Sequence, residues 1–157
     1  MKTALRRSSV AAALLSSVAI VAAETAPRKI TKATGPFDLN RTPQSAADAP
    51  VGRFSLDKKY HGDLEGTGVG EMLTGMTPVQ GSAGYVAIEK VTGSLAGRRG
   101  TFFLQHSGTM NRGQPRLTIS VIPDSGTGEL TGLTGTMEIQ IARDGSHSYL
   151  FAYALPE

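Results

Sequence analysis

The sequence predicts an all-β fold, a small closed antiparallel barrel of about eight strands. Glycines punctuate the chain from Gly62 to Gly135 and interrupt every helical pattern, which favours short strands joined by tight turns. In the same region apolar residues recur at every second position, so one face of each strand is buried and the other is wet. Closure into a barrel leaves no exposed strand edge, and a sandwich is the alternative.

The predicted strands follow one another with short connections. Alternation is clearest near the C-terminus, where Met137, Ile139 and Ile141 are separated by polar residues. In chain order the expected strands cover residues 53–60, 69–74, 83–91, 101–109, 116–122, 129–133, 136–142 and 146–154.

The N-terminal residues 1–23 have the pattern of a secretory signal peptide. Arg6 and Arg7 precede an apolar stretch over 10–21, and small residues at 21–23 offer a cleavage site. The apolar stretch is too short to span a bilayer and no second one follows it. We therefore expect an exported protein, periplasmic or secreted, with no transmembrane segment in the mature chain. The arginine pair leaves twin-arginine export open beside the general route.

Residues 24–50 predict a flexible N-terminal arm, because they hold four prolines, charges of both signs and no apolar periodicity. Residues 51–157 then form a single barrel domain.

The overall charge does not point to nucleic acid. The chain has 16 basic and 13 acidic residues, and the signal segment contributes three of the basic ones. The remaining residues balance at 13 against 13, so no nucleic-acid partner is expected. The chain has no cysteine, which excludes disulfides and thiolate sites.

Two histidines share the phase of apolar positions that face the core. His106 alternates in step with Phe102 and Leu104, and His147 alternates in step with Tyr149 and the aromatic residues after it. Both could face one cavity, since a barrel of eight strands has room for packed side chains or one small ligand. The alternative is that each histidine caps the core and bonds a backbone carbonyl.

Three glutamates, Glu65, Glu89 and Glu129, lie within the glycine-rich blocks. Glu89 shares the phase of apolar neighbours, and a buried glutamate needs a partner, for which Arg98 or Arg99 is available as an ion pair. The functional alternative is a carboxyl group whose pKa is raised by an apolar cavity until it acts as an acid or base.

Several other motifs lack the context that their chemistry needs. The segment GTGVG at 66–70 has neither the helix nor the lysine of a phosphate loop. The Asp-Ser-Gly segment at 124–126 matches half of an aspartic protease site, but its neighbours favour a plain turn. The three histidines show no metal-ligand spacing, so we expect no metal and no other cofactor.

The blocks together resemble a known family. GDLEG at 62–66, the segment at 84–110, VIPDSGTGELTGL at 121–133 and the closing His-x-Tyr pattern are similar to the bacterial domain-of-unknown-function family 3224. The resemblance covers roughly residues 52–155. It implies an allene-oxide-cyclase-like, calycin-like barrel with a ligand cavity, and it assigns no catalytic residue.

These observations support two functional hypotheses. The first is an exported barrel that binds a small, partly apolar ligand in its cavity. The second is a cyclase or isomerase that uses a Glu/His acid–base pair, with Glu65, Glu89 and His106 as the catalytic candidates. A homo-oligomer is possible in either case. The expected ligand-binding residues are Glu65, Tyr85, Glu89, Gln105, His106, Glu129, His147 and Tyr149.

Overall fold

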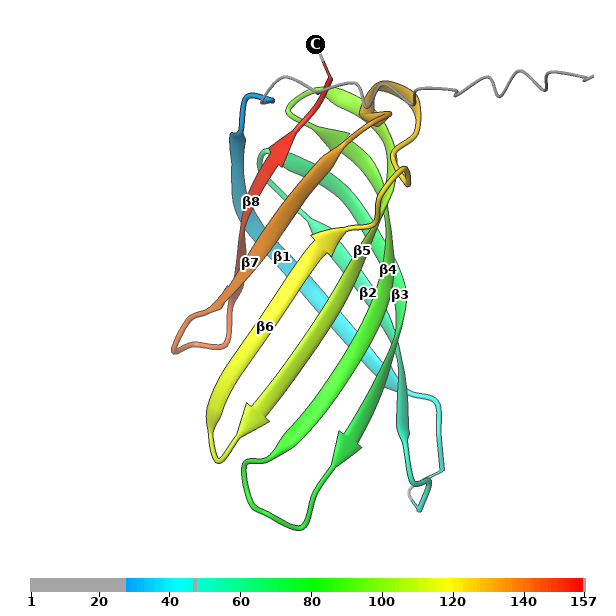
Figure 1. The fold of residues 1–157 in the computed structure, drawn as a ribbon, viewed down its shortest axis with the longest axis vertical. Coiled ribbons are helices and arrows are strands. Elements are labelled where there is room, and N and C mark those ends of the chain that lie inside the picture. Colours follow the sequence, from blue (N-terminus) through cyan, green and yellow to red (C-terminus); the bar gives the residue numbers. More distant parts are fainter. Residues whose placement is uncertain (1–27, 47, 157) are drawn as a thin grey trace, which may run out of the picture.

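The computed structural model describes residues 28–46 and 48–156, and it confirms the all-β barrel (Figure 1). In these residues eight strands pair antiparallel with their sequence neighbours, and β1 also pairs with β8 to close the barrel. A short 3-10 helix, η1, lies between β6 and β7. The elements are β1 (Thr31–Pro43), β2 (Gly52–Tyr60), β3 (Leu64–Met76), β4 (Ala83–Leu95), β5 (Arg98–Asn111), β6 (Gln114–Val121), η1 (Gly128–Leu130), β7 (Thr134–Ile141) and β8 (His147–Ala154).

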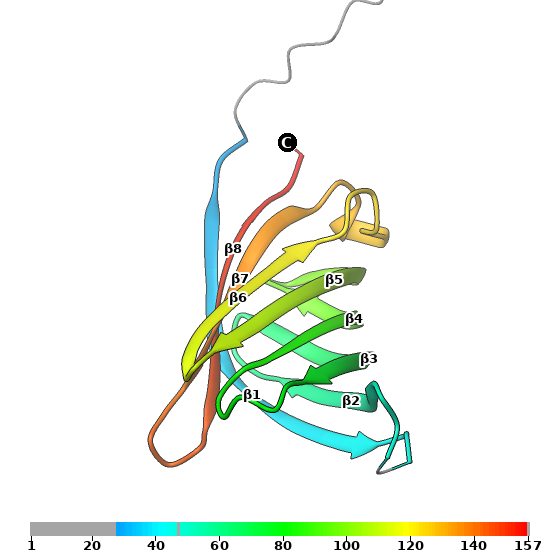
Figure 2. The ribbon, with the colours of Figure 1, turned by 60° about the horizontal axis from the view of Figure 1, so that its bottom comes forward.

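The first strand corrects the expected N-terminal arm. Residues 31–43 are part of the barrel, so the domain begins well before residue 51, while the predicted signal peptide lies outside the described residues. β1 pairs with β8 as far as Phe37 and with β2 from Phe37 onward, and it curves from one neighbour to the other (Figure 2). The strand was missed because Gly35 and Pro36 interrupt its alternation at this change of partner.

A second correction concerns residues 129–133, which form no strand. Gly128 and Gly132 both have positive φ, and the chain between them makes η1 and a turn. Leu130 and Leu133 point into the barrel and close the end at which η1 lies, and their side chains are 0% and 1% exposed. The strand count agreed with the prediction because β1 was missed and this segment was wrongly included.

The glycines of the GDLEGTGVG segment are not all turn residues. Gly66, Gly68 and Gly70 lie within β3, on the side of the strand that faces the interior. A side chain at Gly66 or Gly70 would collide with backbone atoms of β4, and one at Gly68 would collide with the carboxylate of Glu89. These glycines therefore allow a close approach between strands and leave room for one buried side chain.

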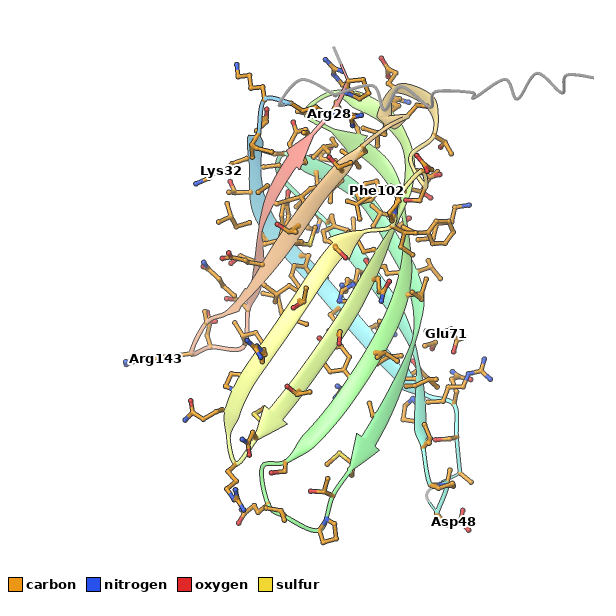
Figure 3. All side chains as sticks on the ribbon, viewed as in Figure 1. Arg28, Lys32, Asp48, Glu71, Phe102 and Arg143 are labelled. Carbon is orange, nitrogen blue, oxygen red and sulfur yellow. The ribbon has the colours of Figure 1, made fainter. Side chains whose placement is uncertain are left out.

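The interior has a filled half and a hollow half. The filled half lies at the closed end, which carries η1, the two termini of the described chain and the β2–β3 and β4–β5 turns (Figure 1). Figure 3 shows Phe102 inside this half. Its buried side chains include Leu64, Leu95, Phe102, Leu104, Leu130, Leu133 and Phe151.

The opposite end, called the open end here, carries the β1–β2, β3–β4, β5–β6 and β7–β8 connections. Toward it β6 and β7 diverge, and the described residues pair them at the single position Ser120–Thr136 (Figure 1). Inward-facing residues become exposed in this direction, from Met137 at 3% to Ile141 at 67%. The barrel is therefore sealed at one end and splayed at the other.

Among the described residues, no helix has the length and apolar character needed to cross a membrane.

Gly35 offers a test of the β1 junction. A methyl group there would overlap the carbonyl oxygen of His61 and approach the Tyr149 hydroxyl to 2.8 Å. We predict that Gly35→Ala lowers the free energy of unfolding by about 1 to 3 kcal/mol, the usual cost of overpacking. Urea titration followed by circular dichroism measures the change.

The matched control is Gly75→Ala in β3, where a methyl group meets nothing within 4 Å. This variant should be as stable as the parent or slightly more stable, because alanine has less backbone entropy to lose. Equal stability of the two variants would contradict the packing described for β1.

Candidate functional site

The hollow half of the barrel holds a cavity of about 410 Å³ that opens at the open end. Its wall is mostly apolar, and all eight strands contribute to it. One lining residue from each strand, taken in chain order, is Phe37, Leu56, Met72, Ala87, His106, Leu117, Ile139 and His147. This volume lies within the range of small-molecule sites in proteins.

A buried polar cluster forms the floor of the cavity. Glu89 is fully buried, and its Oε2 accepts a hydrogen bond of 2.6 Å from Lys58 Nζ. Its Oε1 accepts a hydrogen bond of 2.7 Å from the Tyr60 hydroxyl, which in turn accepts one from Lys58 at 3.3 Å. Lys58 and His106 line the cavity, and the carboxylate lies behind them. Buried charge is thus paired and hydrogen-bonded.

His106 is the least satisfied member of this cluster. Its Nε2 lies 3.2 Å from Glu89 Oε2, but the contact lacks the angle of a hydrogen bond. Within the described part of the chain this buried nitrogen has no hydrogen-bond partner. An unsatisfied buried polar atom is rare in a native protein, so this one needs an explanation, and a catalytic role is one such explanation.

Burial and the neighbouring groups shift the pKa values of Glu89 and Tyr60 in opposite directions. Burial alone raises the pKa of Glu89, but the nearby His106 ring, the Lys58 ammonium and the Tyr60 hydroxyl outweigh it and lower the value to about 2. Burial, and then the charge of Glu89, raise the pKa of Tyr60 well above its ordinary value of 10. At neutral pH the glutamate is therefore an anion and the tyrosine a neutral donor.

The sequence builds this cluster from neighbouring strands. Lys58 and Tyr60 are two residues apart on β2, so both point inward, and Lys58 lies opposite Gly68 on β3. Gly68 has no side chain, which leaves its space to the Glu89 carboxylate from β4. His106 enters from β5, where it pairs with Ala87, two residues from Glu89.

Five of the eight expected site residues lie inside the barrel, though not all at the cavity. Tyr85, His106 and His147 line it, and the His147 ring lies 5.1 Å from that of Phe37. Glu89 lies in the floor. Tyr149 lies deeper and is structural, since its hydroxyl accepts the Leu64 N–H and contacts the carbonyl oxygens of Thr34 and His61.

The other three expected site residues lie on the outer surface. Glu65 and Gln105 are exposed on outward-facing positions of β3 and β5. Glu129 is exposed on η1, where its carboxylate accepts the backbone N–H of Arg99. The expectation that they reach the cavity is wrong. Gln105 stands between the inward-facing Leu104 and His106, so the alternation itself places it outside.

The expected ion pair of Glu89 also needs correction. Arg98 and Arg99 follow the β4–β5 turn at the closed end and are exposed, so neither reaches Glu89. The partner is Lys58, which the sequence analysis missed. Its signal was present, because Lys58 alternates in phase with Leu56 and Tyr60 as an inward-facing residue does.

The cluster does not have the composition of a metal site. In the part of the chain that the structure describes, no three histidine, aspartate or glutamate side chains converge as a metal ion would require.

The buried ion pair makes a specific prediction about stability and pH. Glu89→Gln leaves the Lys58 ammonium without an ionised partner, so we expect unfolding at pH 7 to become easier by about 3 kcal/mol or more. Glu89 has its pKa lowered from 4.5 to about 2 on folding, so its stabilisation is present above pH 4.5 and is lost as the pH falls toward 2. The difference in the free energy of unfolding between the parent and Glu89→Gln should therefore become smaller as the pH falls from 4.5 to about 2.

The control is Glu71→Gln, which breaks the exposed pair between Glu71 and Arg53 on the outer wall. Exposed pairs contribute little, so this variant should follow the parent at every pH. Denaturant titrations at a series of pH values compare the three proteins. A Glu89→Gln protein as stable as the parent at pH 7 would show that the cluster is not an ion pair.

Comparisons with known proteins support the resemblance found in the sequence. A solved structure of a protein of unknown function from the DUF3224 family, from Shewanella oneidensis MR-1, is 51% identical, with a TM-score of 0.76 over 82% of this chain and 99% of that one. No curated protein matches. The family model described as "Protein of unknown function (DUF3224)" matches residues 33–153, which include β1 from Ala33 onward. The chain therefore belongs to the DUF3224 family.

Proposed function

We propose that the protein is an exported barrel that binds a small, partly apolar molecule in its cavity. The observation that carries this proposal is the cavity of about 410 Å³, which has apolar walls from eight strands and a polar floor at Lys58 and His106. Apolar walls with a few placed polar groups are the usual composition of small-molecule sites. The proposed export rests on the signal-like pattern of residues 1–23.

The floor limits what the bound molecule can be. Lys58 and Glu89 neutralise each other at 2.6 Å, so the deep part of the cavity offers polar atoms without a net charge. A ligand with an uncharged polar group next to a hydrocarbon or aromatic body matches this arrangement. Such a group could accept a hydrogen bond from Lys58 or contact the His106 ring, while the body packs against Leu56, Met72 and Ala87.

Filling the cavity tests this proposal. Ala87 is a buried residue of the wall, and Ala87→Phe places a ring in the space that the ligand would use. A steric cost of about 2 kcal/mol corresponds to an affinity loss of roughly thirtyfold. Native mass spectrometry of the protein from its host, together with thermal-shift screens of apolar compounds, measures binding.

Val86→Phe is the matched control, because Val86 is the adjacent residue, points outward and is 52% exposed. It should bind like the parent, and circular dichroism verifies that both variants fold. Equal binding by the two variants places the ligand outside the cavity. A parent protein that binds no compound in either assay would end the proposal.

A second candidate function is an isomerase or cyclase, and one observation favours it. His106 lines the cavity while its Nε2 faces the Glu89 carboxylate at 3.2 Å. With Nε2 turned toward the carboxylate, proton exchange with a bound molecule would fall to the other ring nitrogen, Nδ1. Glu89 itself is a weak base at a pKa of about 2, and Glu65 lies outside, so His106 carries this hypothesis alone.

Proton exchange in deuterium oxide separates catalysis from binding. If His106 moves a proton, a ligand found in the cavity should gain deuterium at carbon when incubated with the parent protein. His106→Gln should still bind the ligand but should lose the exchange. Mass spectrometry of the extracted ligand gives the result. A ligand that returns unlabelled from the parent protein removes the enzyme hypothesis and leaves the binding proposal standing.

A further inference from the structure

The rim of the cavity exposes several large apolar side chains. Five of them line the cavity and are between 38% and 79% exposed, and they come from five different strands. They form a ring around the mouth at the open end. The members of this apolar ring are Leu39, Met76, Met110, Leu117 and Ile141.

The loops at the open end extend the same character. Val51 in the β1–β2 connection and Val79 in the β3–β4 connection are also about half exposed. Exposed apolar groups gathered at one end of a domain mark a surface that another phase or molecule covers.

The charges at the open end have a predominant sign. Four arginines lie there: Arg41 and Arg116 line the mouth, and Arg112 and Arg143 occupy the tips of two hairpins. Among the described residues of the open-end loops the acids are Asp48 and Asp144. Figure 3 shows Asp48 and Arg143 at hairpin tips of this end. The nearby Arg53 is paired with Glu71, so that pair adds no net charge. The four arginines therefore outnumber the two aspartates around the apolar ring.

We propose that the open end docks on a bilayer that carries anionic lipid. The apolar ring would enter the boundary between headgroups and acyl chains, and the arginines would contact the lipid phosphates. Exposed apolar side chains with arginines beside them match this chemistry. The apolar side chains would contact the acyl chains while the guanidinium groups reach the phosphates above them. The proposal concerns the rim and does not require that the cavity binds a ligand.

A second copy of the chain fits this surface less well. Two open ends placed face to face would bring eight arginines against four aspartates, and like charges across an interface disfavour association. An anionic lipid surface has no such repulsion. The apolar ring is continuous with the cavity wall. On a docked protein, a partly apolar molecule could therefore pass between the membrane and the barrel without crossing water.

Vesicle flotation tests the proposal with two lipid compositions. The protein is mixed with vesicles of phosphatidylcholine alone, or of equal parts phosphatidylcholine and phosphatidylglycerol, and is then centrifuged through a density gradient. We expect the protein to float with the anionic vesicles, and this binding should weaken as salt screens the arginines. Failure to float with anionic vesicles at low salt would overturn the proposal.

Paired variants locate the contact. Met76→Gln with Ile141→Gln removes the two most exposed members of the ring, and its matched control, Val69→Gln with Val86→Gln, changes two exposed residues of the outer wall. The first pair should lose vesicle binding and the second should keep it. The reverse result overturns the proposal, and circular dichroism verifies the fold of each protein.

A charge-matched pair completes the test. Arg112→Gln with Arg143→Gln removes two arginines from hairpin tips, and we expect roughly a fivefold weaker binding for each. Lys29→Gln with Lys32→Gln removes two exposed charges near the closed end and should change little.

Sedimentation of the protein without lipid tests self-association. If the protein does not float with vesicles but forms a dimer, and the rim variants dissociate that dimer, the proposal is overturned and the rim is a self-association surface. Thermal-shift binding of compounds without vesicles reports on the cavity separately.

Discussion

Closure of the sheet by β1 is the constraint on which the rest of this structure depends. One strand must bridge β8 and β2, and it does so by pairing with each along half of its length, with Phe37 common to both. The curvature this requires brings Gly35 against the β2–β3 turn, where the Tyr149 hydroxyl joins three strands. The barrel is closed tightly at that end, whereas β6 and β7 diverge toward the other end, where the cavity opens.

The polar cluster lies at the boundary between the filled and the hollow halves. Burying Glu89 is costly by itself, and the short contacts to Lys58 and Tyr60 offset that cost. An apolar floor of similar volume would serve stability equally well, because a buried ion pair seldom gains over hydrophobic packing. Stability alone therefore does not explain a lysine and a histidine at the base of an apolar cavity. The placement is explained if these side chains face a bound molecule.

The strands with regular alternation were predictable, and so was the inward direction of His106 and Glu89. Three features were not. Proline and glycine in β1 hide a strand whose partners lie at both ends of the chain. Glu65 precedes the strand that the pattern indicated, so no phase was available to place it outside. Lys58 was overlooked because a lysine rarely faces a core, and its partner Glu89 is 31 residues away in sequence.

The choice between a binding and a catalytic function depends on which side chains of the cavity floor can gain or lose a proton. Glu89 holds its charge far below neutral pH, because the same contacts that stabilise it lower its pKa to about 2. Tyr60 holds its proton for the opposite reason, since burial and the neighbouring carboxylate both disfavour the phenolate. Two members of the floor are thus fixed in one state at neutral pH, which suits a site that presents constant polarity to a ligand. Proton transfer would fall to the imidazole of the floor, His106, which lines the cavity and has its Nε2 turned toward Glu89, so a catalytic function of the floor depends on His106.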